Sequence, residues 1–106
     1  MRAVAVAACL SAAAIGAGPT TATPHRVTVH IANFSFVPAD TTIITGDTVV
    51  WINDDDFEHV VAADTAAWKS PTLTHGRTFT WVARRAGLVR YHCDAHPVMH
   101  GALTIE

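Results

Sequence analysis

Three side chains that bind soft metal ions lie close together near the end of the chain, at Cys93, His96 and Met99. They are a thiolate, an imidazole and a thioether within one short loop. This mixture suits copper, because sulfur stabilises Cu(I) while imidazole binds both oxidation states of the metal. The spacing therefore predicts three of the four ligands of one copper ion, with the fourth ligand coming from elsewhere in the chain.

The missing ligand is expected to be another histidine, and position in the chain distinguishes the histidines. His59 follows a loop and opens an expected strand, so its ring can face the end of the fold where Cys93 lies. His92 is the direct neighbour of Cys93 and therefore points to the opposite face of the same strand. Position thus favours His59 and makes His92 a poor ligand.

The third donor of the loop, in the axial position, is less determined by spacing. Met99 precedes the expected last strand, but His100 beside it could take its place. His96 and His100 also have the i, i+4 spacing of a zinc-binding pair on a helix. Pro97 and the strand that follows argue against a helix there. Met99 is therefore preferred, and the helical zinc pair remains an alternative.

Alternation of apolar and polar residues predicts about seven short strands and almost no helix. The expected fold is all-β, an antiparallel Greek-key β-sandwich. A hairpin around Gly46 and Asp47 is expected to join two of the strands, and the rings of Phe34 and Phe36 are both expected in the core. The expected strands cover residues 27–32, 41–45, 48–53, 59–62, 78–82, 88–93 and 101–105.

Two connecting segments have less regular composition. Residues 54–58 are strongly acidic and are expected to form an ordinary solvated turn, although their charge could also steer a partner. Residues 64–76 contain a proline and a glycine, and residues 66–69 within them could form a short helical turn.

The first 22 residues have the layout of a secretory signal peptide, with Arg2, an apolar run over residues 3–15 and small residues after it. Cleavage is expected after Ala17 or Ala22. A retained membrane anchor is the weaker interpretation, because the apolar run is shorter than the roughly 20 residues that a span needs. We therefore expect an exported protein, periplasmic or secreted, in which residues 23–106 form a single domain.

Charge argues against nucleic acid as a partner. The whole sequence has a formal net charge of -2. Loss of residues 1–22 would lower the count of Lys and Arg from 7 to 6 and leave the 9 Asp and Glu, which gives the domain a net charge of -3. Nucleic-acid-binding domains usually carry a basic surface.

Loss of residues 1–22 would also leave Cys93 as the only cysteine. Metal ligation would protect such a lone thiol in an oxidising compartment.

Residues 91–99 resemble the copper loop of the amicyanin-like cupredoxins, within the plastocyanin and azurin family, and share their short Cys-x-x-His-x-x-Met spacing. The similarity continues upstream through residues 34–38 and 46–53 and extends to His59. It covers essentially the whole chain from about residue 27 onward. The resemblance implies the cupredoxin fold and one type 1 copper ion.

The resemblance also implies a role for five residues. The copper ligands would be His59, Cys93, His96 and Met99. The side chain of Asn53 would tie the His59 strand to the cysteine loop, and groups of this kind hold metal ligands in place.

The sequence departs from the family pattern beside the first histidine. Glu58 stands where proline is usual, and Val60 stands where asparagine is usual. A carboxylate at Glu58 is expected to favour Cu(II), so that Glu58→Gln would raise the reduction potential.

The resemblance implies transfer of single electrons between redox partner proteins. Four protein ligands leave no open position on the metal for a substrate, so an enzyme is not expected. The partners are expected to dock weakly on an apolar rim around His96, Pro97 and Val98. The mature protein is expected to be a monomer without a membrane span.

Two other functions remain open at this stage. A copper carrier or copper-resistance protein would use the same ligands together with further surface histidines. A copper domain of a multicopper oxidase or nitrite reductase system would need a second site of clustered histidines, and the sequence has no His-x-His pair. The further histidines that a copper carrier would use are His25, His30, His75 and His100.

Overall fold

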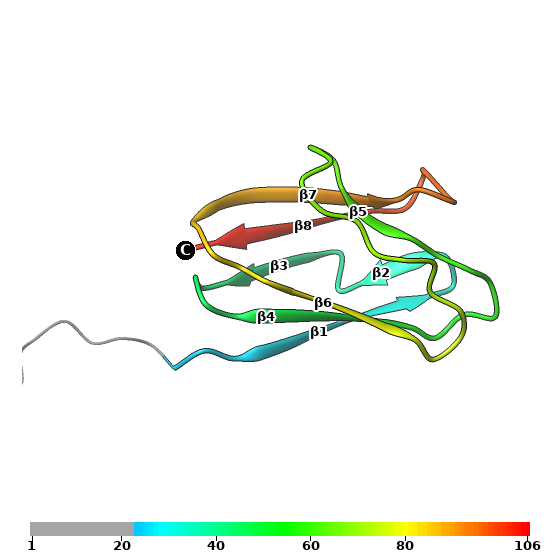
Figure 1. Cartoon of the computed structure of the whole chain (residues 1–106), viewed down its shortest axis with the longest axis horizontal. Helices are drawn as coiled ribbons and strands as arrows, with labels where there is room; N and C mark the ends of the chain where they lie inside the picture. The colour runs from blue at the N-terminus through cyan, green and yellow to red at the C-terminus, as the bar shows by residue number, and fades with distance from the viewer. Residues whose placement is uncertain (1–22) are drawn as a thin grey trace, which may run out of the picture.

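The computed structural model describes residues 23–106, which form eight strands arranged as two packed sheets (Figure 1). Within this range no helix is long and apolar enough to cross a membrane. The expected signal peptide lies outside the described residues. The strands are β1 (Arg26–Ala32), β2 (Ser35–Val37), β3 (Asp40–Ile43), β4 (Thr48–Asn53), β5 (Val61–Ala63), β6 (Thr78–Val82), β7 (Gly87–Cys93) and β8 (His100–Ile105).

The two sheets each have four strands and enclose a single core. One sheet has the order β2-β1-β4-β6 and the other the order β3-β8-β7-β5. Alternating residues of the strands fill the space between them, with Trp51 and Tyr91 as the largest fully buried side chains. The expected all-β sandwich is confirmed, with eight strands because the extended segment after β1 forms the short strand β2.

The expected hairpin around Gly46 and Asp47 is wrong. β3 pairs in parallel with β8, whereas β4 pairs in parallel with β1 and antiparallel with β6. The chain therefore crosses from one sheet to the other at this turn. The consecutive buried residues Val49, Val50 and Trp51 explain the difference, because a strand buried on both faces belongs inside a sheet with a neighbour on each edge.

The turn between β1 and β2 corrects a second expectation. Ala32 pairs directly with Ser35, so Asn33 and Phe34 are the two residues of a tight hairpin loop. Both have positive φ, 53° and 56°, as the favoured two-residue hairpin turns require. Phe34 is therefore turned out of the core and is 40% exposed, whereas Phe36 is buried as expected.

The segment between β5 and β6 contains turns and bends instead of the helical turn considered at residues 66–69. Isolated bridges join His59 to Leu73 and Ala62 to Lys69, so this segment folds back along the chain that enters β5. The turn after β1, the loop after β4 and the loop after β7 lie at the same end of the sandwich as this segment, on the right in Figure 1.

Asp47 fixes the crossing between the sheets, and its contribution should depend on pH. Its carboxylate accepts hydrogen bonds from the backbone N–H of Ile44 and of His25. These two bonds hold the pKa of Asp47 below its ordinary value of 3.8. A lowered folded-state pKa means that the unfolded chain binds the proton more tightly, so the stabilisation is present above pH 3.8 and is lost as the pH falls through the folded-state pKa.

We therefore expect Asp47→Asn to lower the free energy of unfolding at pH 7 and to reduce the loss of stability on acidification. Urea unfolding at a series of pH values measures both effects. The exposed Asp56→Asn serves as the control. Equal stability of the wild type and Asp47→Asn at pH 7 would contradict this role.

Candidate metal centre

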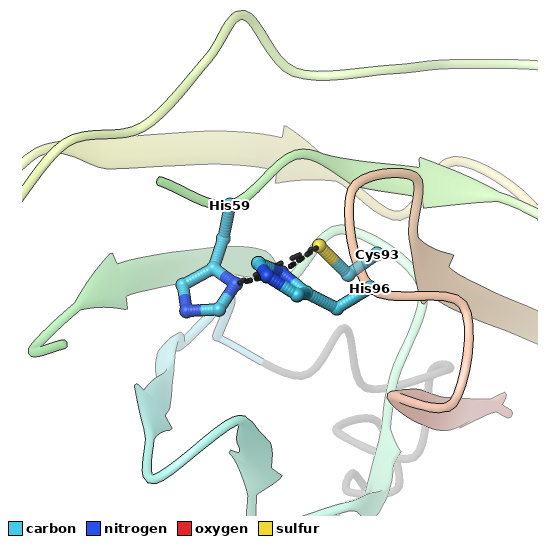
Figure 2. A group of neighbouring side chains, drawn as sticks. All are labelled: His59, Cys93 and His96. Atoms are coloured by element: carbon cyan, nitrogen blue, oxygen red, sulfur yellow. Dashed lines mark hydrogen bonds between the residues drawn. The ribbon is translucent and has the colours of Figure 1, made fainter. Parts of the chain in front are cut away.

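Three predicted ligands converge at the loop end of the sandwich (Figure 2). Sγ of Cys93 lies 3.6 Å from Nδ1 of His59 and 3.7 Å from Nδ1 of His96. The two imidazole Nδ1 atoms are 3.1 Å apart. The structure therefore brings together His59 and Cys93, which are 34 residues apart in the sequence, as the position of His59 in the chain predicts.

The turn after β7 positions two of these side chains. Cys93 is the last residue of the strand and is fully buried. The N–H of His96 donates to the carbonyl of Cys93, and the N–H of Met99 donates to the carbonyl of His96. The N–H of Cys93 in turn donates to the carbonyl of Met99, which closes the loop. This tight loop returns Met99 to the core, where it is 2% exposed.

His59 is held from both sides by backbone hydrogen bonds. It exchanges two of them with Leu73, at 3.1 and 2.8 Å, and its side chain is fully buried. The next residue connects it to the cysteine loop, because the N–H of Val60 donates to Sγ of Cys93 at 3.4 Å and the carbonyl of Val60 accepts from the N–H of Asp94. The histidine and the cysteine are thus fixed relative to each other.

The size of the triangle fits a metal ion. A point equidistant from the three donor atoms lies about 2.0 Å from each of them, close to the metal bonds of about 2.0–2.1 Å to nitrogen and 2.3 Å to sulfur at zinc sites. Two imidazoles and one thiolate around such a point, with a weak methionine on the axis, are the donor set of blue-copper centres. The donors present in this chain therefore fit copper.

Asp55, which the sequence analysis missed, orients His59. Its Oδ2 accepts a hydrogen bond from Nε2 of His59 at 2.9 Å. With the proton on Nε2, the lone pair is on Nδ1, the atom that faces Cys93 and His96. A carboxylate behind a ligand histidine fixes the orientation of the ring and makes it a stronger donor.

The same carboxylate holds the turn after β1. It accepts the backbone N–H of Asn33 at 2.6 Å and that of Phe34 at 2.9 Å. Burial alone would raise the pKa of Asp55, but the hydrogen bonds from Phe34, Asn33 and His59 outweigh burial and hold the pKa below its ordinary value. Asp55 is therefore ionised at neutral pH.

The expectation of an ordinary solvated turn at residues 54–58 is thus wrong for one of its members. The side chain of Asp55 is 12% exposed, whereas that of Asp56 is 94% exposed. The signal in the sequence was a carboxylate four residues before His59 in a loop that had to turn back on itself. The sequence does not distinguish Asp55 from its three acidic neighbours, because all four carboxylates in residues 54–58 are equally suited to solvent.

Asn53 supports the site, but through other partners than the expected cysteine loop. Its Nδ2 donates to the carbonyls of Phe57 and Leu73, and its Oδ1 accepts from the N–H of Asp55. The fully buried amide therefore ties the loop that carries Asp55 to the segment that holds His59.

An apolar surface surrounds His96. The ring of Phe34 contacts the imidazoles of His96 and His59 edge-on, with ring centres 5.0 and 5.5 Å apart. Phe57 packs against Phe34 at 5.0 Å. Phe57 and Val98 are 58% and 86% exposed, so large apolar side chains face solvent beside the one partly exposed ligand.

The remaining histidines lie outside this centre. His92 faces away from it, as expected, and its ring bridges the carboxylates of Asp64 and Asp94. His100 is exposed at the start of β8, and the residues between it and His96 form a turn instead of a helix. The helical zinc pair is therefore not formed.

Comparisons with known proteins agree with this geometry. No protein-family model matches the chain. The amicyanin of Paracoccus denitrificans is 31% identical over 85 residues, which cover 76% of this chain and 65% of the relative. The chain thus spans just under two thirds of the length of this curated relative.

Solved structures of similar proteins superpose on the described fold. An amicyanin mutant in its oxidised state has a TM-score of 0.72 and 31% identity, covering 76% of this chain and 82% of its own. A purple cupredoxin from Nitrosopumilus maritimus has a TM-score of 0.71 and 26% identity, covering 76% of this chain and 99% of its own.

The contact between Asp55 and His59 predicts the effect of Asp55→Asn. The variant keeps the shape of the side chain but loses its charge, and its amide nitrogen would face backbone N–H groups. We expect the affinity for copper to fall about 10- to 100-fold. Competition with a chromophoric Cu(I) chelator measures this loss, with Asp56→Asn as the matched exposed control. Unchanged affinity in Asp55→Asn would contradict the role of this hydrogen bond.

Reduction potentials test which carboxylate, Asp55 or Glu58, has the larger influence on the copper centre. The sequence alone points to Glu58 as the carboxylate that favours Cu(II). Glu58 is exposed, whereas Asp55 contacts the ligand ring. Removing the nearer charge should destabilise Cu(II) more, so Asp55→Asn should raise the potential more than Glu58→Gln does. A larger rise in Glu58→Gln would reverse the assignment.

Proposed function

The chain belongs to the amicyanin-like cupredoxins, and we propose from this membership and its metal centre that it carries single electrons on one copper ion. The ligands would be His59, Cys93, His96 and Met99. The observation that carries the proposal is the triangle of two imidazole nitrogens and one thiolate sulfur, whose edges are 3.1, 3.6 and 3.7 Å. Amicyanin-like cupredoxins carry type 1 copper and are electron carriers rather than enzymes.

Burial supports Met99 over His100 as the residue that would supply the fourth ligand. Alternation along the chain buries Met99 and exposes the residue after it. Met99 belongs to the same core cluster as Cys93, and the backbone N–H of Cys93 donates to its carbonyl. A thioether buried in the same cluster as the thiolate would complete the set of donors that suits copper.

A bound copper ion supplies reversible one-electron chemistry at this centre. The chain holds the donors so that they move little when the charge of the centre changes. His59 is fixed by Leu73 and Asp55, and Cys93 receives a hydrogen bond from Val60. Full burial of His59 and Cys93 keeps water from one side, while His96 reaches toward the surface.

The surface around His96 suits weak docking of redox partners. His96, Pro97 and Val98 are joined there by Phe34 and Phe57, and the exposed apolar side chains offer contact area without ordering a loop. An exposed apolar patch beside a ligand histidine suits a transient complex, which must dissociate quickly after the electron has moved. The proposed site of action is the periplasm, reached through the signal peptide at residues 1–22, and the proposed working unit is a monomeric domain of residues 23–106.

The surface histidines give little support to copper delivery as an alternative function. His30 contacts Asp54 at 2.7 Å, and His25 and His75 each lie 3.8 Å from a different aspartate. Each of these histidines thus has its own carboxylate partner. Within residues 23–106, the group of at least three metal-binding side chains is that of His59, Cys93 and His96.

Electron self-exchange between oxidised and reduced copies of the loaded protein tests the proposal without a known partner. NMR line broadening in mixtures of the two forms measures the rate. We expect Val98→Glu to lower this rate at least about tenfold, because two copies would meet with like charges in an apolar contact. Thr104→Glu places the same charge on an exposed position of β8 and should have a smaller effect.

Two results would count against the proposal. If the loaded wild-type protein showed no reversible one-electron wave in voltammetry, electron transfer would be excluded. If Thr104→Glu slowed self-exchange as much as Val98→Glu, the docking surface would lie elsewhere.

A further inference from the structure

A groove lies between β6, at the edge of one sheet, and the first part of β7 in the other sheet. β5 pairs only with the last three residues of β7, so the first part of β7 has a free outer edge, and β6 is the edge strand of the other sheet. The loop at residues 83–86 crosses between the sheets, on the left in Figure 1, and borders the groove there. The volume of the groove is about 840 Å³, which is within the range of small-molecule sites.

Aromatic side chains form the wall of this groove. Trp68 and Trp81 both line it and are both partly exposed. Their ring centres are 5.2 Å apart with an angle of 34° between the planes, and Trp68 packs in turn on the buried Trp51. The two indoles are thus held against the core and offer faces on which a flat ring can stack. Leu88, which is 56% exposed, adds apolar surface on the opposite side.

The charge at the groove has one sign. Arg84 and Arg85 are exposed, and they are the charged residues among those that line it. This is a local positive site on a chain whose net charge is -2. Guanidinium groups bind carboxylates through paired hydrogen bonds, and the hydroxyls of Thr65 and Thr80 add polar groups nearby.

We propose that this groove binds a small planar aromatic anion, with the ring against Trp68 and Trp81 and the anionic group at Arg84 and Arg85. The site shares no lining residue with the metal centre. Its occupancy is therefore independent of the proposed electron transfer, and either proposal can fail without the other. The commitment to a small molecule rests on the size of the open groove, its aromatic wall and the positive charge of its two lining arginines.

Naphthalene-2-carboxylate is a suitable probe, and the reduced, copper-loaded protein is diamagnetic and can be followed by ¹H–¹⁵N NMR. We expect the indole N–H signals of Trp68 and Trp81 to shift on titration, and that of the buried Trp51 to shift less. The backbone signals of the loop at residues 94–99 should not move. Saturable shifts in this loop instead of in the groove would overturn the proposal.

Charge recognition is tested with the uncharged analogue naphthalene-2-carboxamide. We expect the carboxylate to bind about tenfold more tightly than the amide, as a charge-assisted hydrogen bond at an exposed site allows. Arg84→Gln combined with Arg85→Gln should abolish this preference, and Arg77→Gln, an exposed arginine outside the groove, should preserve it. Equal binding of the two probes to the wild type would overturn the proposal.

Tryptophan substitution and sedimentation complete the test. Trp81→Leu should weaken both probes while the visible spectrum of the copper centre stays unchanged, which shows that the variant is folded. If sedimentation instead reveals a dimer that the carboxylate dissociates, the groove is a contact between copies of the chain and the proposal is wrong.

Discussion

The hydrogen bond between Asp55 and His59 is the interaction on which the rest of the centre depends. One carboxylate accepts the ring N–H of His59 and the backbone N–H groups of Asn33 and Phe34, and thereby joins the segment after β4 to the turn after β1. It fixes the ring nitrogen that faces the thiolate. It also stabilises a left-handed backbone at Phe34, a conformation that costs a bulky residue on the order of 1–3 kcal/mol. That turn places the aromatic ring against both histidines. The geometry of the metal donors and the apolar surface beside them therefore have a common origin.

The sandwich makes this arrangement rigid. β7 delivers Cys93 to the end of one sheet, and the bridge to Leu73 delivers His59 from the segment beside it. Tyr91 lies two residues before the cysteine and packs edge-on against Trp51, so the strand that carries the sulfur is anchored in the core. Gly101 lies opposite Tyr91 in β8, where any side chain would collide with the tyrosine ring. The loop between these strands consequently starts and ends at fixed points.

Patterns within short stretches of sequence predict the features that depend on residues close together in the chain. Period-two alternation predicted the all-β sandwich, and the spacing of Cys93, His96 and Met99 predicted a compact set of soft donors. The partners of each strand were not predictable in this way, because the period does not say which edge pairs with which, and so β3 and β4 were wrongly joined in a hairpin. The direction of the Phe34 ring and the partners of Asn53 depend on hydrogen bonds that cross between loops. The role of Asp55 and the groove beside β6 likewise arise only when distant segments meet.

The most direct test of the central claim is the visible and electron paramagnetic resonance spectrum of the protein loaded with one equivalent of Cu(II). A trigonal centre of His59, Cys93 and His96 predicts an intense thiolate-to-copper charge-transfer band and a narrow copper hyperfine splitting. Both features should disappear in Cys93→Ser and persist in His100→Gln. A faint band typical of copper bound to surface histidines, unchanged by Cys93→Ser, would contradict the account.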